Sequence, residues 1–156
     1  MQELITKATP TGVYIVTVRA GDKINGMTAA WVTQVSFKPK LIAVAIAGQR
    51  FTHGLIKESG IFCLNALPEG GNSLGKHFGF KSGRKVDKMK NIEFTSSLKG
   101  APILKSAYAY VECETVQTVE TGDHTLFVGK VLDCAILDKK AKPLIFEWKD
   151  FFGKKE

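Results

Sequence analysis

The chain has 156 residues and a mass of 17.1 kDa, with 22 basic against 15 acidic residues and a formal net charge of +7. This length suits a single domain over residues 1–156, and a composition that is 44% hydrophobic and 24% charged excludes a disordered, collagen-like or coiled-coil chain. The longest apolar run, residues 41–47, is far shorter than the roughly 20 residues of a membrane helix.

Two further features of composition bear on location and partners. Residues 1–7 lack the basic-then-apolar pattern of a signal peptide, and the odd, widely spaced Cys63, Cys113 and Cys134 lie in strand-like apolar contexts. We therefore expect core thiols in a cytoplasmic protein that binds no membrane. The positive charge favours an anionic partner or simply solubility. Because the lysines are spread along the chain, and the tract 81–90 is interrupted, nucleic acid is not expected.

Strand patterns dominate the first part of the chain. Runs of β-branched, aromatic or apolar residues predict strands at residues 13–18, from 24 to 27, 31–37, 41–47 and 61–67. Between them, Phe51, Leu55 and Ile56 recur at helical spacing, and Gly60 is placed as a C-cap. A second short helix is predicted within residues 70–80, with Leu74 and Phe78 on one side, and turns are expected over residues 82–98.

The second part is more regular. Residues 107–114 alternate between small or apolar residues and Tyr or Glu, which predicts a half-buried strand. The alternation slips at Thr115–Val116, indicating a bulge, and a turn at Gly122–Asp123 leads to an antiparallel partner over residues 125–137. A last strand is expected at residues 143–148. Short connections between so many strands predict a mainly β protein, a small antiparallel barrel of Greek-key type with one to three short helices.

Several familiar motifs are excluded. Residues 70–76 begin like a phosphate-binding P-loop, but His77 stands where that loop needs Ser or Thr. No GxGxxG dinucleotide motif occurs. His53, His77 and His124 stand apart from one another and from the cysteines, so we interpret them as surface or loop residues and predict no metal site.

Three loop segments remain as candidates for ligand binding. Residues 25–31 offer small side chains that would let a flat ring approach the backbone, although a hairpin without ligand has the same pattern. Residues 49–52 combine Arg50 and Thr52 at a predicted helix N-terminus, which favours an anion, although Thr52 alone is more typical of an N-cap. Residues 82–85 add a hydroxyl, a glycine and an arginine, or form only a solvated basic loop.

These segments also resemble a known family. The sequences of residues 25–31, 35–39, 50–52, 80–88 and 122–131 occur in the order and spacing of the flavin reductase-like family, over about residues 10–148. The resemblance implies an FMN-binding split barrel, a homodimer, and FMN rather than FAD as the cofactor. Lys85 and Met89 depart from the family pattern, which commonly has an acid and Phe there.

The resemblance also assigns roles to residues. It implies that Met27, Thr28, Ala29, Ala30 and Trp31 contact the isoalloxazine ring and that Gln49, Arg50, Thr52, Ser82, Gly83 and Arg84 face the phosphate. His124 would lie where a nicotinamide stacks, and no protein acid, base or nucleophile is expected to be catalytic. The aromatic composition of residues 148–152 suggests that they lean on the flavin of a partner subunit.

Three functions follow from this resemblance and from the charge. The first is an NAD(P)H-dependent flavin reductase that passes hydride or electrons through FMN to free flavin or a protein acceptor. The second is a flavoredoxin-type electron carrier, whose basic surface docks an acidic protein such as a rubredoxin or ferredoxin. The third is a module that binds anions without redox chemistry.

Overall fold

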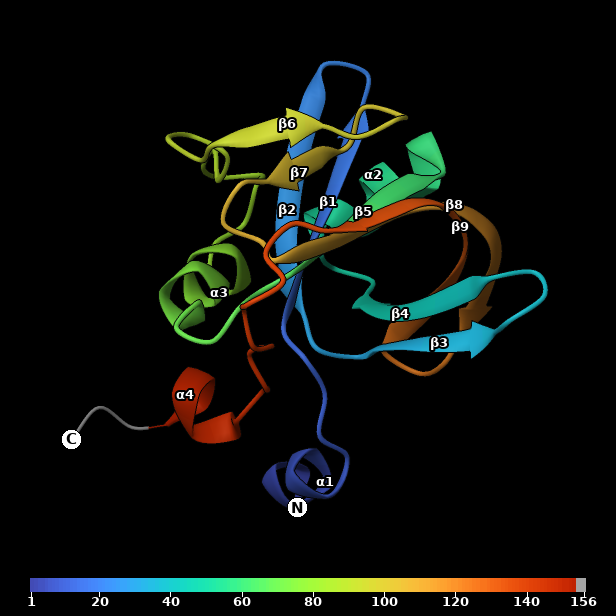
Figure 1. The fold of residues 1–156 in the computed structure, drawn as a ribbon. Coiled ribbons are helices and arrows are strands. Elements are labelled where there is room, and N and C mark those ends of the chain that lie inside the picture. Colours follow the sequence, from blue (N-terminus) through green and yellow to red (C-terminus); the bar gives the residue numbers. More distant parts are fainter. Residues whose placement is uncertain (154–156) are drawn as a thin grey trace.

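Nine strands and four short helices make up residues 1–153, the part of the chain that the computed structural model describes (Figure 1). The strands are β1 (Tyr14–Ala20), β2 (Lys23–Ala29), β3 (Val32–Ser36), β4 (Leu41–Ala47), β5 (Ile61–Ala66), β6 (Phe94–Ser96), β7 (Pro102–Leu104), β8 (Ala109–Glu120) and β9 (His124–Ile136). The helices are α1 (Gln2–Ala8), α2 (Phe51–Ser59), α3 (Asn72–Gly79) and α4 (Trp148–Phe152). No helix among residues 1–153 has the length and hydrophobicity that a membrane crossing requires.

The predicted mainly β barrel is confirmed. Seven strands form one antiparallel sheet in the order β2-β1-β5-β8-β9-β4-β3, and β6 pairs with β7 in a separate hairpin. The sheet curls until β2 contacts β4, and the Trp31 carbonyl accepts a hydrogen bond of 3.0 Å from the Ala45 amide. The long β8–β9 arm spans both halves of the barrel and carries the predicted bulge at Val116.

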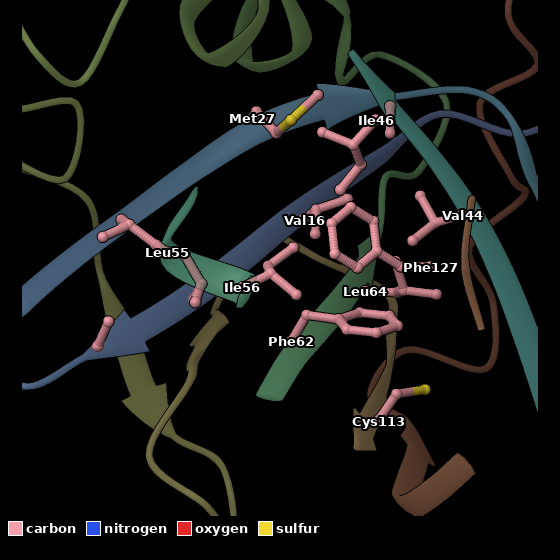
Figure 2. Packing of buried hydrophobic residues seen from close by; sticks show 13 residues of the cluster. Val16, Met27, Val44, Ile46, Leu55, Ile56, Phe62, Leu64, Cys113 and Phe127 are labelled. Atoms are coloured by element: carbon pink, nitrogen blue, oxygen red, sulfur yellow. The ribbon is translucent and has the colours of Figure 1, made fainter. Parts of the chain in front are cut away.

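Apolar side chains from six strands and α2 fill the barrel (Figure 2). Phe62 and Phe127 lie at its centre with no exposed surface, and Leu55 and Ile56 of α2 close one end. Burial of one such side chain contributes about 1.5–3 kcal/mol. Helix α2 ends at Gly60, whose φ of 73° has the left-handed conformation predicted for a C-cap. A second cluster, which includes Phe78 of α3, covers the outer face of β1.

Two sequence expectations about elements are wrong. Residues 143–148 form only isolated bridges, at Pro143 and Ile145, because the proline has no amide hydrogen to continue a ladder. The chain then turns into α4, which, like α1, no sequence pattern predicted; both lie beside the open end of the barrel in Figure 1. The hairpin of β6 and β7 was also unexpected, since residues 82–98 were expected to form turns.

Three side chains are placed differently from their expectations. Cys134 is exposed, because a register shift between Val131 and Asp133 changes which residues of β9 face inward; Cys63 and Cys113 are buried as expected. His53 is buried in α2, 2.8 Å from the Thr125 hydroxyl, instead of lying on the surface or in a loop. Glu112 falls on the polar side of the alternation, yet the β6–β7 hairpin buries it completely.

Gly129 tests the packing at the barrel centre. A Cβ atom added there would lie 2.7 Å from Phe62 and 2.6 Å from the Cys113 side chain, so Gly129→Ala should destabilise the protein by about 1–3 kcal/mol through overpacking. Gly54→Ala is the matched control, because Gly54 lies exposed in α2 with no atom within 4 Å, and the change should stabilise by roughly 0.5–1 kcal/mol. Urea unfolding measures both; equal stabilities of the two variants would contradict this packing.

Candidate functional site

An apolar cavity of about 330 Å³ lies at the C-terminal end of β2. Its wall on the barrel side is made of small or flat residues from the β2–β3 connection and from β4: Met27, Thr28, Ala29, Ala30, Trp31, Ala45 and Ala47. All five residues expected at a flavin ring are therefore brought together on one wall. Thr28 donates a hydrogen bond of 2.5 Å to the Gly75 carbonyl, which ties this wall to α3.

His124 also lines the apolar cavity, as expected for a residue near the ring. Its ring lies 4.7 Å from that of Trp31, centroid to centroid, and its Nδ1 is 2.6 Å from a carboxylate oxygen of Asp123. This contact, first through the hydrogen bond and then through the charge of His124, lowers the pKa of Asp123. The pair fixes the orientation of the imidazole at the mouth of the cavity.

Aromatic side chains from the C-terminal segment form the opposite wall. Phe152 of α4 packs edge-on against Phe80 at 5.7 Å and lies 4.5 Å from Trp148, and all three line the cavity together with Phe146 and Phe151. The segment thus covers the apolar cavity of its own chain. Its suggested approach to the flavin of a partner subunit remains a prediction. The aromatic composition of residues 148–152 was recognised in the sequence, but α4 was not predicted, because a five-residue helix has no periodicity to recognise.

A second, basic cavity of about 250 Å³ adjoins the first. It is lined by Asn25, Met27, Gln49, Arg50, Phe51, Thr52, Lys81, Ser82, Gly83 and Lys88. Met27 and Arg50 line both cavities, so an apolar space and a cationic space meet at these two residues. Together the two cavities match a flat ring that carries an anionic tail.

Arg50 and Thr52 hold the boundary between the cavities. Arg50 donates a hydrogen bond of 3.0 Å to the Gly79 carbonyl, and its burial lowers the pKa of its guanidinium. The N-cap interpretation of Thr52 is wrong, because α2 begins at Phe51 with Arg50 as its N-cap. The fully buried Thr52 hydroxyl accepts a hydrogen bond of 2.8 Å from Asn25, which leaves its own hydrogen free to donate.

The 82–85 segment is divided between the basic cavity and its rim. Ser82 and Gly83 line the cavity, and a Cβ atom at Gly83 would collide with Asn25 and lie 2.7 Å from Phe51. Arg84 instead lines an adjoining hollow. Its guanidinium donates to the Gln49 carbonyl at 2.8 Å and lies over the Phe51 ring at 5.3 Å, so it braces the loop that forms the cavity.

Four residues that line the basic cavity were not assigned a contact from the sequence: Asn25, Phe51, Lys81 and Lys88. A signal existed for the first, since Asn is unfavourable in the interior of a strand and Asn25 is only 2% exposed. Lys81 and Lys88 lie in the basic tract and within the segment 80–88 that carries the family resemblance, but neither was assigned a contact. Burial, and then the nearby Arg50 guanidinium, lower the pKa of Lys88 to about 8. Among residues 1–153, no group of three or more His, Cys, Asp or Glu side chains could hold a metal ion.

Comparison with known proteins agrees with this geometry. The family described as "Flavin reductase like domain" matches residues 6–154. The chain is 42% identical over 137 residues to the high molecular weight rubredoxin of Moorella thermoacetica, covering 85% of this chain and 60% of that protein. It therefore spans less than two thirds of that relative's length.

Solved structures share the fold. The FMN-binding protein from Thermus thermophilus with bound 1-cyclohex-2-enone superposes with a TM-score of 0.83 at 34% identity, covering 91% of this chain and 84% of that one. The Streptomyces globisporus NADH:FAD oxidoreductase SgcE6 superposes with a TM-score of 0.82 at 29% identity, covering 89% and 82%.

Proposed function

The chain belongs to the flavin reductase-like family, and from this we propose that it is an FMN-binding oxidoreductase that takes electrons from NADH or NADPH. One observation carries the proposal: an apolar cavity with a small-residue wall meets a cationic cavity at Met27 and Arg50. An isoalloxazine ring fits the first and a phosphate fits the second. FMN is favoured over FAD because a solved structure that is 34% identical to this chain is that of an FMN-binding protein.

When bound, FMN would supply the two-electron redox chemistry. The residues of the chain would bind and orient it. The alanines of β2 and β4 would let the ring lie against the backbone, while Trp31 and the aromatic wall of α4 would keep water from its faces. Arg50, at the junction, would place positive charge beside the ring and beside the phosphate. His124, held by Asp123, would border the space for a nicotinamide.

Stopped-flow reduction of the FMN-loaded protein by NADH and by NADPH tests this proposal. We expect binding of FMN in a 1:1 ratio, which makes the protein yellow, and rapid bleaching of the bound flavin by one of the two nucleotides. If the protein binds no flavin, the proposal is contradicted, and a module that binds anions without redox chemistry is the remaining candidate function. Turnover that requires added free flavin would identify a reductase for which flavin is a substrate.

A second candidate, the electron carrier, is favoured by the surface around the basic cavity. Lys81, Arg84 and Lys85 are exposed there, and Arg84 lies on the rim. Such a patch would attract an acidic redox protein. The relative from Moorella thermoacetica is named a rubredoxin, which is consistent with a partner of this kind. Tight FMN with slow reduction by both nucleotides would favour the carrier.

Arg50→Ala should weaken FMN binding by roughly 10- to 150-fold, which corresponds to about 1.5–3 kcal/mol for one charge-assisted contact. Arg84→Ala is the matched control of equal charge change. It should weaken binding less, because the Arg84 guanidinium braces Gln49 from outside the cavity. Quenching of FMN fluorescence on titration measures both affinities. Unchanged affinity in Arg50→Ala would overturn the placement of the phosphate.

We also propose a homodimer. The edge strand β3, the turn that follows it and the β8–β9 arm expose Val35, Phe37, Val116 and Val119, with Phe37 84% exposed. Exposed apolar surface of this extent on strands marks a protein interface. Phe37→Asp should shift the protein to monomers in sedimentation velocity, whereas Leu98→Asp, at a residue 71% exposed on another loop, should not. A wild-type monomer, or a Phe37→Asp dimer, would contradict this interface.

A further inference from the structure

Lys88 carries a buried amine without a counter-ion. The residue is 3% exposed, and its Nζ donates a hydrogen bond of 3.0 Å to the Phe78 carbonyl at the end of α3. No carboxylate within residues 1–153 forms an ion pair with it. Lysine is almost never fully buried unless it is paired, because removing an ammonium from water is costly. The position therefore lacks a negative group.

The charged groups around Lys88 do not supply one. The cations are Arg50 and Lys81 in the basic cavity and, across the adjoining hollow, Lys23, Arg84 and Lys85. The remaining titratable groups are His77, whose Nε2 lies 2.8 Å from the Lys88 carbonyl, and Asp22 and Asp87 in the hollow. Asp87 instead accepts a hydrogen bond of 2.9 Å from the Met89 amide. Of these charged groups, Arg50 is the one whose repulsion lowers the pKa of the amine, in addition to the larger effect of burial.

We propose that the phosphate of FMN is the missing counter-ion, and that its binding is coupled to the uptake of one proton from solvent by the Lys88 amine. The inference rests on the proposed function. A phosphate monoester has its second pKa near 6, so above pH 8 it enters the basic cavity as a dianion. A negative group beside a buried amine favours the charged ammonium. The proton goes to Nζ, and no bond to the flavin is made or broken.

The coupling has a definite sign. In the free protein the pKa of Lys88 is about 8, so at higher pH a growing fraction of the amine is neutral and must be protonated when the phosphate binds. The Kd for FMN should therefore vary least between the second phosphate pKa near 6 and the Lys88 pKa of about 8, and it should rise by up to tenfold per pH unit above about pH 8. Riboflavin has the same ring without the phosphate, so its Kd should lack this slope.

Isothermal titration calorimetry of the apoprotein at pH 8.5 tests the coupling, in buffers that differ in ionisation enthalpy. We expect FMN binding to take up a measurable fraction of one proton, because much of Lys88 is neutral at this pH, and riboflavin to take up almost none. If wild-type protein does not bind FMN, the proposed function fails. If FMN binds without proton uptake, the coupling fails and the proposed function stands.

Two variants show whether Lys88 is the group that takes up the proton. Lys88→Arg keeps a charge that cannot be titrated in this range, so it should bind FMN without proton uptake. Lys88→Met removes the charge from a buried position, so it should bind FMN at least tenfold more weakly at pH 7, and with no added slope above pH 8. Proton uptake by Lys88→Met equal to that of the wild type would overturn the assignment.

Discussion

Positive charge held inside the protein, next to an apolar cavity, is the constraint on which the site depends. Arg50 and Lys88 donate to backbone carbonyls at the end of α3, and neither has an acidic partner among residues 1–153. Two cations placed so close destabilise the unliganded protein, and a bound anion would relieve that cost. In the unliganded protein, the stability of the packed barrel offsets this cost. Arg50 and Lys88 are therefore already in place for a phosphate.

Strand β2 organises both halves of the site. Asn25 lines the basic cavity, Met27 lies at the junction, and Ala29 lines the apolar cavity. Alternate residues on one face of β2 would therefore contact the proposed ligand from its phosphate to its ring. Helices α2 and α3 then bring Arg50 and Phe78 to the same strand, since both pack on β2. The packing of both helices on one strand fixes the distance between the apolar cavity and the positive charge.

Sequence alone predicted most of the barrel, because its strands carry their own periodicity and α2 carries its own C-cap. It predicted the cavity residues only where short motifs place several of them together, as in residues 27–31 and 49–52. The segment 80–88 that carries the resemblance includes Lys88, but the burial of its amine could not be predicted, because that amine is held by the Phe78 carbonyl ten residues earlier. The burial of Glu112 was not predicted for the same reason. The alternation of residues 107–114 is typical of a half-exposed strand, but the β6–β7 hairpin covers Glu112.

The most direct test of the account is a crystal structure of the protein with FMN. The account places the phosphate in the basic cavity within hydrogen-bonding distance of both Arg50 and Lys88, and the isoalloxazine ring in the apolar cavity against residues 27–31. A flavin whose phosphate points to solvent, or whose ring lies outside the apolar cavity, would contradict it.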